Sequence, residues 1–361
     1  MIDPNWWQDR QVLVAGHTGF KGAWLCMMLH RLGARVHGVA LAPEGPRSLY
    51  ADASVGRFLA SENIIDLADL DAVRDVVNDV NPEIVFHFAA QSLVRRAHME
   101  PVLTFRSNVL GTVHLLEALR DCLTLKSVLI TTTDKVYFNQ EHGRPFREFD
   151  RLGGYEPYAA SKAATEFVVS AYRSSYLGRN GVAVNVARAG NVIGGGDWCA
   201  DRIVPDIIRS VAADETLEIR SPAAVRPWQH VLDALAGYLL LVQLRREASV
   251  KAQNEPELAA WNFGPDVTEQ MPTVGEICEI AQQFWPTKFR WRHAVDSSGV
   301  KESKLLLLDP ARAMQELSWR PCFAVREALS ETFKWYEAFL DGEDAAVLCR
   351  NAVDRYVSSA D

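Results

Sequence analysis

The chain has 361 residues, enough for one large domain or two of medium size, and its 48% hydrophobic and 23% charged content is that of an ordinary globular protein. A net charge of −8 gives no overall attraction for nucleic acid, and the absence of a long apolar run or a secretory signal argues against a membrane and for a cytoplasmic protein. Six scattered cysteines fit a reducing compartment, and the nine histidines have no metal-binding spacing, so no metal is expected.

The first predicted strand, 11–15, is followed at once by a glycine-rich turn and a helix over 23–32. Gly16, Gly19 and Gly22 follow the spacing G-x-x-G-x-x-G rather than G-x-G-x-x-G. In a dinucleotide fold such glycines permit a tight turn, close approach to a pyrophosphate and close packing of the helix on the strand. The free N–H groups at the start of the helix then bind the phosphates. The turn therefore predicts a dinucleotide site.

Strand and helix patterns alternate as far as residue 190. The further strands are expected at 35–40, 63–67, 83–91, 126–132 and 182–188. This alternation predicts an α/β fold, with a doubly wound parallel (Rossmann) sheet in residues 1–190. Residues 191–361 are expected to form a smaller C-terminal domain in which some segments return to the sheet. It includes helices near 273–284 and 325–340 and a frayed helix over 343–361.

Residues at the strand ends are expected to line the cofactor site, because ligands bind outside the carboxyl ends of parallel strands. Asp66 could meet the adenine, and the small Ala89 and Ala90 leave room for the cofactor. The predicted set is Gly16, Thr18, Gly19, Phe20, Lys21, Gly22, Asp66, Leu67, Ala89, Ala90 and Gln91. No acid for an adenosine ribose stands at 40–42, and Arg47 could face a 2′-phosphate or solvent, so local residues leave NAD and NADP open.

A cluster of titratable residues follows the fifth strand and begins the next helix. Tyr158 and Lys162 lie one turn apart on one helix face, and an ammonium beside a phenol favours the phenolate. This predicts a lowered tyrosine pKa and a base for an alcohol, although the same spacing fits a surface helix with a half-buried tyrosine. Asp134 and Lys135 add an acid and a second candidate base. These groups exceed the needs of one oxidation, so a longer reaction is expected.

Together these parts resemble the extended short-chain dehydrogenase/reductase superfamily and, within it, the CDP-glucose branch of the nucleotide-sugar 4,6-dehydratases. The resemblance covers about residues 8–340. It is carried by GHTGFKG (16–22), HFAAQSLVRR (87–96), TDK (133–135), GGYEPYAASK (153–162), RAGNVIGGGDW (188–198) and RPWQHV (226–231). Related dTDP- and GDP-sugar dehydratases usually carry an acidic residue where Lys135 stands, and sugar epimerases of the superfamily lack the acid/base pair.

The resemblance implies NAD as cofactor and CDP-glucose as substrate. It implies that Tyr158 takes the proton of the sugar 4-hydroxyl, that Lys162 tunes this tyrosine and binds the cofactor ribose, and that Thr133 bonds the 4-oxygen. Asp134 would be the acid for the leaving C6 hydroxyl and Lys135 the base at C5. A lysine base must be neutral, which burial and nearby positive charge favour. The alternative is that Lys135 stays charged and that Asp134 or water moves the proton.

The C-terminal domain is expected to bind the nucleotide sugar. The candidate substrate-binding residues are Asn191, Arg188, Arg202, Arg226, Trp228 and Glu302, and arginines suit a pyrophosphate because they bind phosphate oxygens in pairs. Two alternatives stay open. Arg202 could instead pair with Asp201 or Asp206, and Trp228 could be a core aromatic residue.

The same residues leave two other functions open, and two of the predicted helices indicate an oligomer. A nucleotide-sugar epimerase or reductase would use only Thr133, Tyr158 and Lys162, and a non-catalytic dinucleotide sensor would not need a phenolate. A homodimer is expected through helices at about 101–122 and 158–177, with a homotetramer as the larger alternative. These helices carry apolar residues beyond one stripe, namely Val109, Val113, Leu116, Leu119, Phe167, Val168, Tyr172 and Tyr176.

Overall fold

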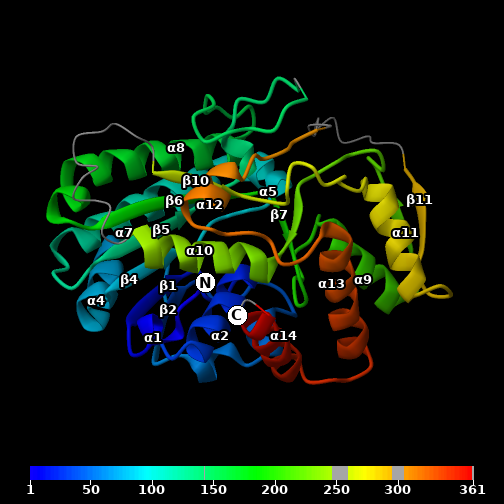
Figure 1. Cartoon of the computed structure of the whole chain (residues 1–361), viewed down its shortest axis with the longest axis horizontal. Coiled ribbons are helices and arrows are strands. Elements are labelled where there is room, and N and C mark those ends of the chain that lie inside the picture. The colour runs from blue at the N-terminus through cyan, green and yellow to red at the C-terminus, as the bar shows by residue number, and fades with distance from the viewer. Residues whose placement is uncertain (142, 246–258, 295–304, 360–361) are drawn as a thin grey trace.

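A parallel sheet of seven strands lies at the centre of the molecule (Figure 1). The computed structural model describes residues 1–361 except 142, 246–258, 295–304 and 360–361. The strand order is β10-β6-β5-β4-β1-β2-β3, which confirms the doubly wound fold. The strands are β1 (Gln11–Ala15), β2 (Arg35–Ala40), β3 (Ser61–Ile64), β4 (Ile84–His87), β5 (Ser127–Thr131), β6 (Ala183–Ala189) and β10 (Ala260–Phe263).

Helices cover both faces of this sheet. One face meets α2 (Phe20–Arg31) and α10 (Val231–Arg245), and the other meets α4 (Leu70–Val80), α7 (Gly111–Ala118) and α8 (Pro157–Tyr172). Alternation along a strand explains the division, since Val12 and Val14 belong to the first buried cluster, and Leu13 and Ala15 to the second. The helices thus cover the two faces of the sheet and leave the carboxyl ends of its strands accessible.

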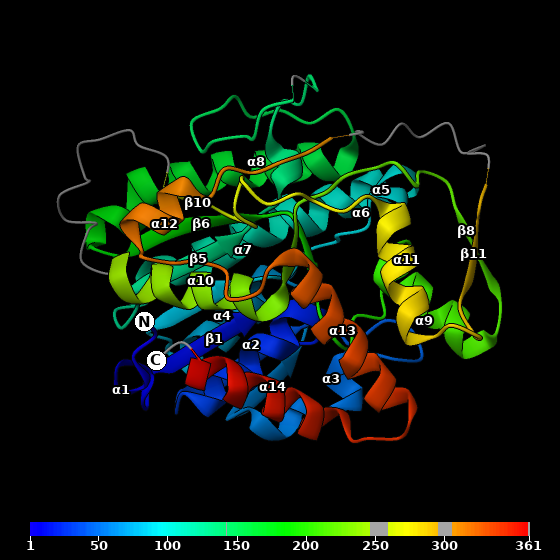
Figure 2. The same ribbon diagram turned by 45° about the vertical axis from the view of Figure 1, so that its right-hand side comes forward.

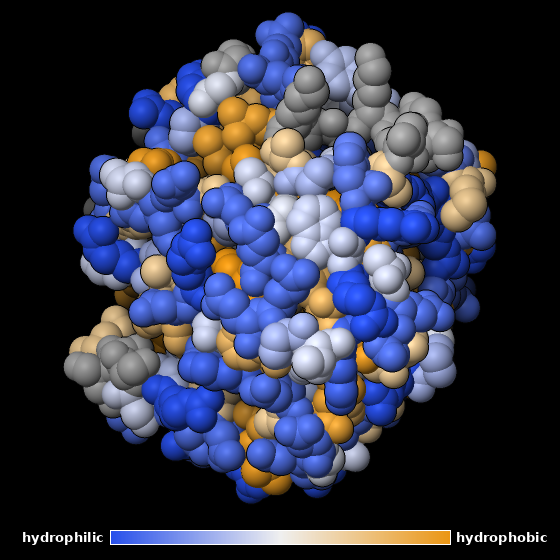
Figure 3. Space-filling view, turned by 90° about the vertical axis from the view of Figure 1, so that its right-hand side faces the viewer, coloured by the Kyte–Doolittle hydropathy of each residue, from blue (hydrophilic) through white to orange (hydrophobic). Residues whose placement is uncertain are grey.

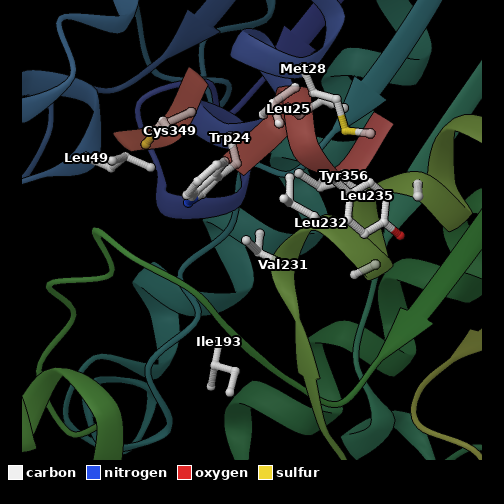
Figure 4. Packing of buried hydrophobic residues seen from close by; sticks show 14 of the residues in the cluster. Trp24, Leu25, Met28, Leu49, Ile193, Val231, Leu232, Leu235, Cys349 and Tyr356 are labelled. Atoms are coloured by element: carbon white, nitrogen blue, oxygen red, sulfur yellow. The ribbon is translucent and has the colours of Figure 1, made fainter. Parts of the chain in front are cut away.

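The C-terminal helix α14 (Ala345–Ser359) is not frayed, contrary to expectation. It packs on α2, and Figure 4 shows Cys349 and Tyr356 close to Trp24 and Met28. The Tyr356 hydroxyl also donates a hydrogen bond of 2.8 Å to Asp233 of α10. Apolar residues one turn apart make one face of this helix part of the main core, which holds α14 in place.

The smaller part of the molecule contains two short sheets and the helices beside them (Figure 2). In them β7 (Asn191–Ile193) pairs with β9 (Trp228–His230), and β8 (Thr216–Ile219) with β11 (Arg290–His293). The helices are α9 (Ile203–Ala213), α11 (Val274–Phe284) and α13 (Val325–Leu340). The end that carries β11 and α11 is mostly polar at its surface, with apolar side chains in small groups (Figure 3). From this half of the chain, β10, α10 and α12 (Ala311–Glu316) return to the large sheet.

Short helical segments complete the described part. They are α1 (Pro4–Trp7), α3 (Leu49–Asp52), α5 (Val94–Met99) and α6 (Pro101–Phe105), π-helical turns at Arg106–Leu110 and Arg173–Leu177, and 3-10 turns at Val55–Phe58, Leu119–Asp121, Asp134–Val136 and Gly178–Asn180. The π-helical turns interrupt the two helices that were predicted as continuous. Among the described residues, no helix combines the length and the hydropathy needed to cross a bilayer.

Candidate active site

One cavity of about 1150 Å³ opens at the carboxyl ends of the central strands. It lies beside β1, whose two neighbours in the sheet are β2 and β4, so the connections on its two sides run in opposite directions. Such a switch point is where open parallel sheets bind ligands. The glycine turn after β1 and the titratable cluster after β5 both line this central cavity. The expected meeting of the two motifs in one crevice is therefore present in the fold.

The glycine turn shapes the part of the cavity next to β1. Gly16 has a φ of +94°, and a Cβ at this position would lie 2.5 Å from the amide nitrogen of Ala89. A Cβ at Gly22 would lie 2.1 Å from the carbonyl oxygen of Gly16. Helix α2 then begins after Gly19 with no side chain capping its N–H groups. These groups can receive a pyrophosphate, so the turn fits a dinucleotide.

The other predicted cofactor residues also line the central cavity. They are Thr18, Phe20, Lys21, Asp66, Leu67, Ala89, Ala90 and Gln91. Some of them also hold the walls in place, since Thr18 Oγ1 donates to the carbonyl of Leu41 and Asp66 accepts from the amide of Ala68. Arg47 is exposed to solvent, as one of the two alternatives expected, and its guanidinium lies 5.0 Å from the centre of the Trp198 ring.

Tyr158 and Lys162 enter the cavity from the first turns of α8. Glu156 caps this helix, with one carboxylate oxygen 2.7 Å from the amide of Tyr158 and the other 2.7 Å from that of Ala159. Lys162 donates a hydrogen bond of 3.0 Å to the carbonyl of Thr131. Glu156 is not among the residues predicted from the sequence, although an acid directly before Pro157 is a typical start of a helix.

The expected lowering of the Tyr158 pKa is wrong for the protein by itself. Burial raises the pKa of Tyr158 to about 12, despite a hydrogen bond with Thr133 and the charge of Arg202. Burial, together with the charge of Lys21, lowers the pKa of Lys162 to about 7. The loss of water around the phenol thus outweighs the neighbouring cations. A phenolate at Tyr158 requires further positive charge in the cavity.

Thr133, Asp134 and Lys135 form a tight turn directly after β5. Thr133 Oγ1 donates to Asp134 Oδ1 at 2.9 Å and accepts from the amide of Lys135 at 3.3 Å. The Lys135 ammonium lies 4.0 Å from the same Asp134 oxygen. Asp134 is buried, whereas the Lys135 side chain is 32% exposed, and all three residues line the cavity. Because the strand has ended, neighbouring side chains reach the same space.

The part of the cavity farther from β1 carries polar groups from the smaller sheets. Arg202 bonds Asp197 at 3.0 Å and Ser92 at 3.1 Å, rather than Asp201 or Asp206. Three other predicted substrate residues, Asn191, Arg226 and Trp228, also line it. The indole nitrogen of Trp228 has no hydrogen-bond partner among the described residues, so this buried ring can still donate.

Arg188 corrects the predicted substrate set. Its side chain is fully buried and does not line the cavity. It forms an ion pair of 2.5 Å with Glu166 of α8, because a charge inside the molecule requires a charged or polar partner. Glu166 was missed, although it follows Lys162 by one helical turn. Glu302 lies outside the described residues.

Comparisons with known proteins agree with this architecture. A model of the NAD dependent epimerase/dehydratase family matches residues 12–254. CDP-glucose 4,6-dehydratase of Salmonella typhimurium is 40% identical over 366 residues, which cover 99% of each chain. dTDP-glucose 4,6-dehydratase of Haemophilus influenzae is 27% identical and covers 75% of this chain and 81% of its own length. The fold resembles UDP-glucose-4-epimerase of Stenotrophomonas maltophila with bound NAD, with a TM-score of 0.76, 21% identity and coverage of 92% and 99%.

Proposed function

Because the chain belongs to the NAD dependent epimerase/dehydratase family of the extended short-chain dehydrogenases/reductases, we propose that it is a CDP-glucose 4,6-dehydratase. It converts CDP-D-glucose to CDP-4-keto-6-deoxy-D-glucose and water by oxidation at C4, elimination across C5 and C6, and reduction at C6. The main support is the full-length similarity to an enzyme of that name. In addition, Asp134 and Lys135 line the same cavity as the tyrosine–lysine pair.

Bound NAD would supply the acceptor and later the donor of the hydride that moves from C4 to C6, and its oxidised ring would add positive charge that favours a phenolate at Tyr158. The glycine turn and the open start of α2 would hold its pyrophosphate. Lys162 would bind the ribose beside the nicotinamide. Most of this machinery belongs to residues 1–190, which we assign as the cofactor-binding and catalytic domain.

Tyr158 and Thr133 act on the sugar 4-oxygen. The phenolate takes the hydroxyl proton, and the Thr133 hydroxyl holds the oxygen as it becomes a carbonyl. Lys162 raises the local positive charge while protonated, which helps the phenol to ionise.

Asp134 and Lys135 act in the elimination step. The 4-keto group acidifies the C5 proton, Lys135 removes this proton, and Asp134 gives a proton to the leaving C6 hydroxyl. The second oxygen of Asp134 is buried without a partner among the described residues, which suits it to contact the leaving group. The competing assignment keeps Lys135 charged and gives the C5 proton to Asp134 or to water.

The nucleotide part of the substrate lies against residues 191–361, mainly on the smaller sheets. Arg202 and Arg226 offer charge to the pyrophosphate, Asn191 offers an amide, and the Trp228 indole nitrogen offers a further donor. Arg188 is no longer a candidate because Glu166 already pairs with it. CDP-glucose is a soluble metabolite, and we place the reaction in the cytoplasm.

The chain forms a homodimer in this proposal, or a homotetramer built from two dimers. Apolar residues with large exposed fractions lie on α6, on α8 and on the π-helical turns that follow these two helices. This α6/α8 surface contains Val102 (81% exposed), Phe105 (40%), Leu110 (42%), Phe167 (66%) and Tyr176 (41%). An exposed patch of this kind is typical of a protein interface. Of the residues first assigned to it, Leu116 and Leu119 are buried against the sheet instead.

The assay of CDP-glucose turnover tests this function. Incubation with NAD and CDP-glucose should yield a product with the alkaline absorbance of a 4-keto-6-deoxy sugar, without net formation of NADH. Parallel incubations with dTDP-glucose and GDP-mannose should give far less product. A CDP-hexose that differs from glucose only at C4 would instead support an epimerase, and net reduction of NAD would support a simple dehydrogenase.

A further inference from the structure

The guanidinium of Arg188 is the centre of a buried hydrogen-bond network beneath residues 133–136, the catalytic turn that carries Asp134 and Lys135. It donates to Glu166 through Nε at 2.8 Å and through Nη2 at 2.5 Å. Its Nη1 donates to the Tyr137 hydroxyl at 2.8 Å and to the carbonyl of Glu148 at 2.9 Å. Arg188 and Glu166 are both completely enclosed. Every nitrogen of this guanidinium is therefore used inside the protein, which excludes a direct role in binding substrate.

Through its partners, Arg188 is connected to residues on both sides of the catalytic turn in the sequence. Glu166 also accepts a hydrogen bond of 2.7 Å from Thr132 Oγ1, one residue before Thr133. Tyr137, on the other side, follows Val136 at the end of the turn. One guanidinium thus holds both ends of residues 133–136, one end through Glu166 and the other directly.

Further contacts fix the Tyr137 end of this connection. The Tyr137 hydroxyl donates to Asn262 Oδ1 at 2.7 Å, and the backbone N–H of Asn262 donates to the Glu148 carboxylate at 2.8 Å. The Tyr137 ring stacks on Phe146, with ring centres 4.9 Å apart. The position of Tyr137 is therefore set by groups from β10 and from the segment before α8, and not by the turn itself.

We propose that Arg188 is a positioning residue, which holds the turn 133–136 at both ends and so places Asp134 and Lys135 against C5 and C6 of the sugar. This role rests on the proposed dehydratase function. Displacement of reacting groups by about 1 Å can cost a hundredfold in rate, so a fixed turn has a large kinetic effect. A buried ion pair is a weak source of stability but a good means of fixing geometry.

The same network holds the oxidising residues less directly. The start of α8 with Tyr158 is fixed by the Glu156 cap, and Lys162 is fixed by the carbonyl of Thr131. Thr133 supplies one hydrogen bond to the C4 oxidation, whereas Asp134 and Lys135 supply both proton transfers of the elimination. A loosened turn should therefore slow elimination more than oxidation. A purely structural role would affect stability and both steps alike.

Two variants test this difference, Arg188→Lys and the double variant Thr132→Val/Tyr137→Phe. Arg188→Lys removes the forked contact directly, and Thr132→Val and Tyr137→Phe each remove one hydroxyl while they keep the side-chain shape. Thr332→Val and Tyr238→Phe are matched controls, since both residues are fully buried outside this network. Thr332 bonds only the carbonyl of Ala328 within the described structure, and the Tyr238 hydroxyl has no partner there.

The first readout is the ratio of two rates in a single turnover with CDP-glucose, the formation of reduced nicotinamide and the incorporation of solvent deuterium at C5. We expect the rate of incorporation, relative to oxidation, to fall by about tenfold or more in Thr132→Val/Tyr137→Phe and in Arg188→Lys. The ratio should be unchanged in both controls. An unchanged ratio in the double variant, or an equal fall in both rates, would overturn the positioning role.

The second readout does not depend on activity. Amide hydrogen exchange of peptides that span residues 132–138 should become faster in the double variant, while exchange in the first turns of α8 stays unchanged. Unchanged exchange at 132–138 would contradict the inference even if the wild-type protein did not act on CDP-glucose. Failure of wild-type turnover with faster exchange in the variant would instead reject only the dehydratase function.

Discussion

The Thr133 hydroxyl donates a 2.9 Å hydrogen bond to one oxygen of the Asp134 carboxylate, and the other oxygen lies buried without a partner among the described residues. The two oxygens of the Asp134 carboxylate therefore differ, since Thr133 orients one of them and the other has no described partner. The free oxygen borders the cavity wall near Gly190, where an added Cβ would lie 3.3 Å away. This arrangement fits an acid that must meet a leaving hydroxyl at a fixed place.

Asp134→Asn and Lys135→Met should separate oxidation from elimination. Both variants should still form reduced nicotinamide with CDP-glucose, because Tyr158 and Lys162 remain, but the release of 4-keto-6-deoxy product should fall by about 10²–10⁴-fold. Rapid mixing with absorbance detection, followed by product analysis, measures the two steps.

The Lys135 variant also distinguishes the two candidates for the C5 base. If Lys135 is the base, exchange of solvent deuterium into C5 should fall in Lys135→Met. If exchange persists while product formation falls, Asp134 or water moves that proton. Normal turnover and normal exchange would remove Lys135 from the mechanism and leave the dehydratase assignment intact.

Tyr158→Phe should abolish turnover and leave NAD binding nearly unchanged. The phenol is the group that takes the alcohol proton, and the loss of a general base costs about 10²–10⁴-fold in rate. Steady-state rates with CDP-glucose and a titration of NAD by calorimetry measure the two effects. A variant with a near-normal rate would exclude Tyr158 as the base.

Lys21→Met should raise the pKa of Lys162. Burial and the charge of Lys21 lower this pKa to about 7, so removal of that charge keeps the Lys162 ammonium protonated to higher pH. Because the ammonium is the active form, the loss of C4 oxidation on the alkaline side should begin at a higher pH. Single-turnover rates between about pH 6 and pH 9 measure the shift. Lys334→Met, at an exposed site on α13, serves as the control. If Lys21→Met instead lost C4 oxidation at a lower pH than the wild type, the argument would be contradicted.

Phe167→Asp should convert the dimer to a monomer. Phe167 is 66% exposed in the single chain, and a carboxylate on the α6/α8 surface would be buried without a partner on association. Light scattering should then give a mass near 40.3 kDa for the variant and twice that for the wild type. Leu123→Asp is the control, since Leu123 is 93% exposed outside this surface. A wild-type monomer at micromolar concentration would reject the interface.

The sequence was sufficient for the fold and for the meeting of the motifs, because hydrophobic alternation and the glycine spacing act locally. Arg188 shows where local reasoning ended. A strand residue can face either side of a sheet, and alternation places Arg188 on the same side as Val186, toward α8 and Glu166. The strand pattern thus predicts which side of the sheet Arg188 faces. Its pairing with Glu166 depends on how α8 packs, which the pattern does not give.

The Tyr158 pKa illustrates a second limit. The four-residue spacing to Lys162 correctly indicates a shared helix face, yet the direction of the shift depends on how far burial outweighs the nearby charges. Burial of one side chain depends on all the segments that surround it. The same holds for α14, whose apolar residues pack on α2, because a local sequence pattern does not predict a contact with a helix so distant in the chain.

The fate of a deuterium label at C4 of CDP-glucose tests the central claim most directly. In a 4,6-dehydratase the label leaves C4 during oxidation and returns to the same sugar at C6, so the product should carry deuterium in its new methyl group with no net change in NAD. Product analysis by mass spectrometry and deuterium NMR measures its place. Deuterium found again at C4 of a CDP-hexose, with no loss of water, would contradict the dehydratase and establish an epimerase.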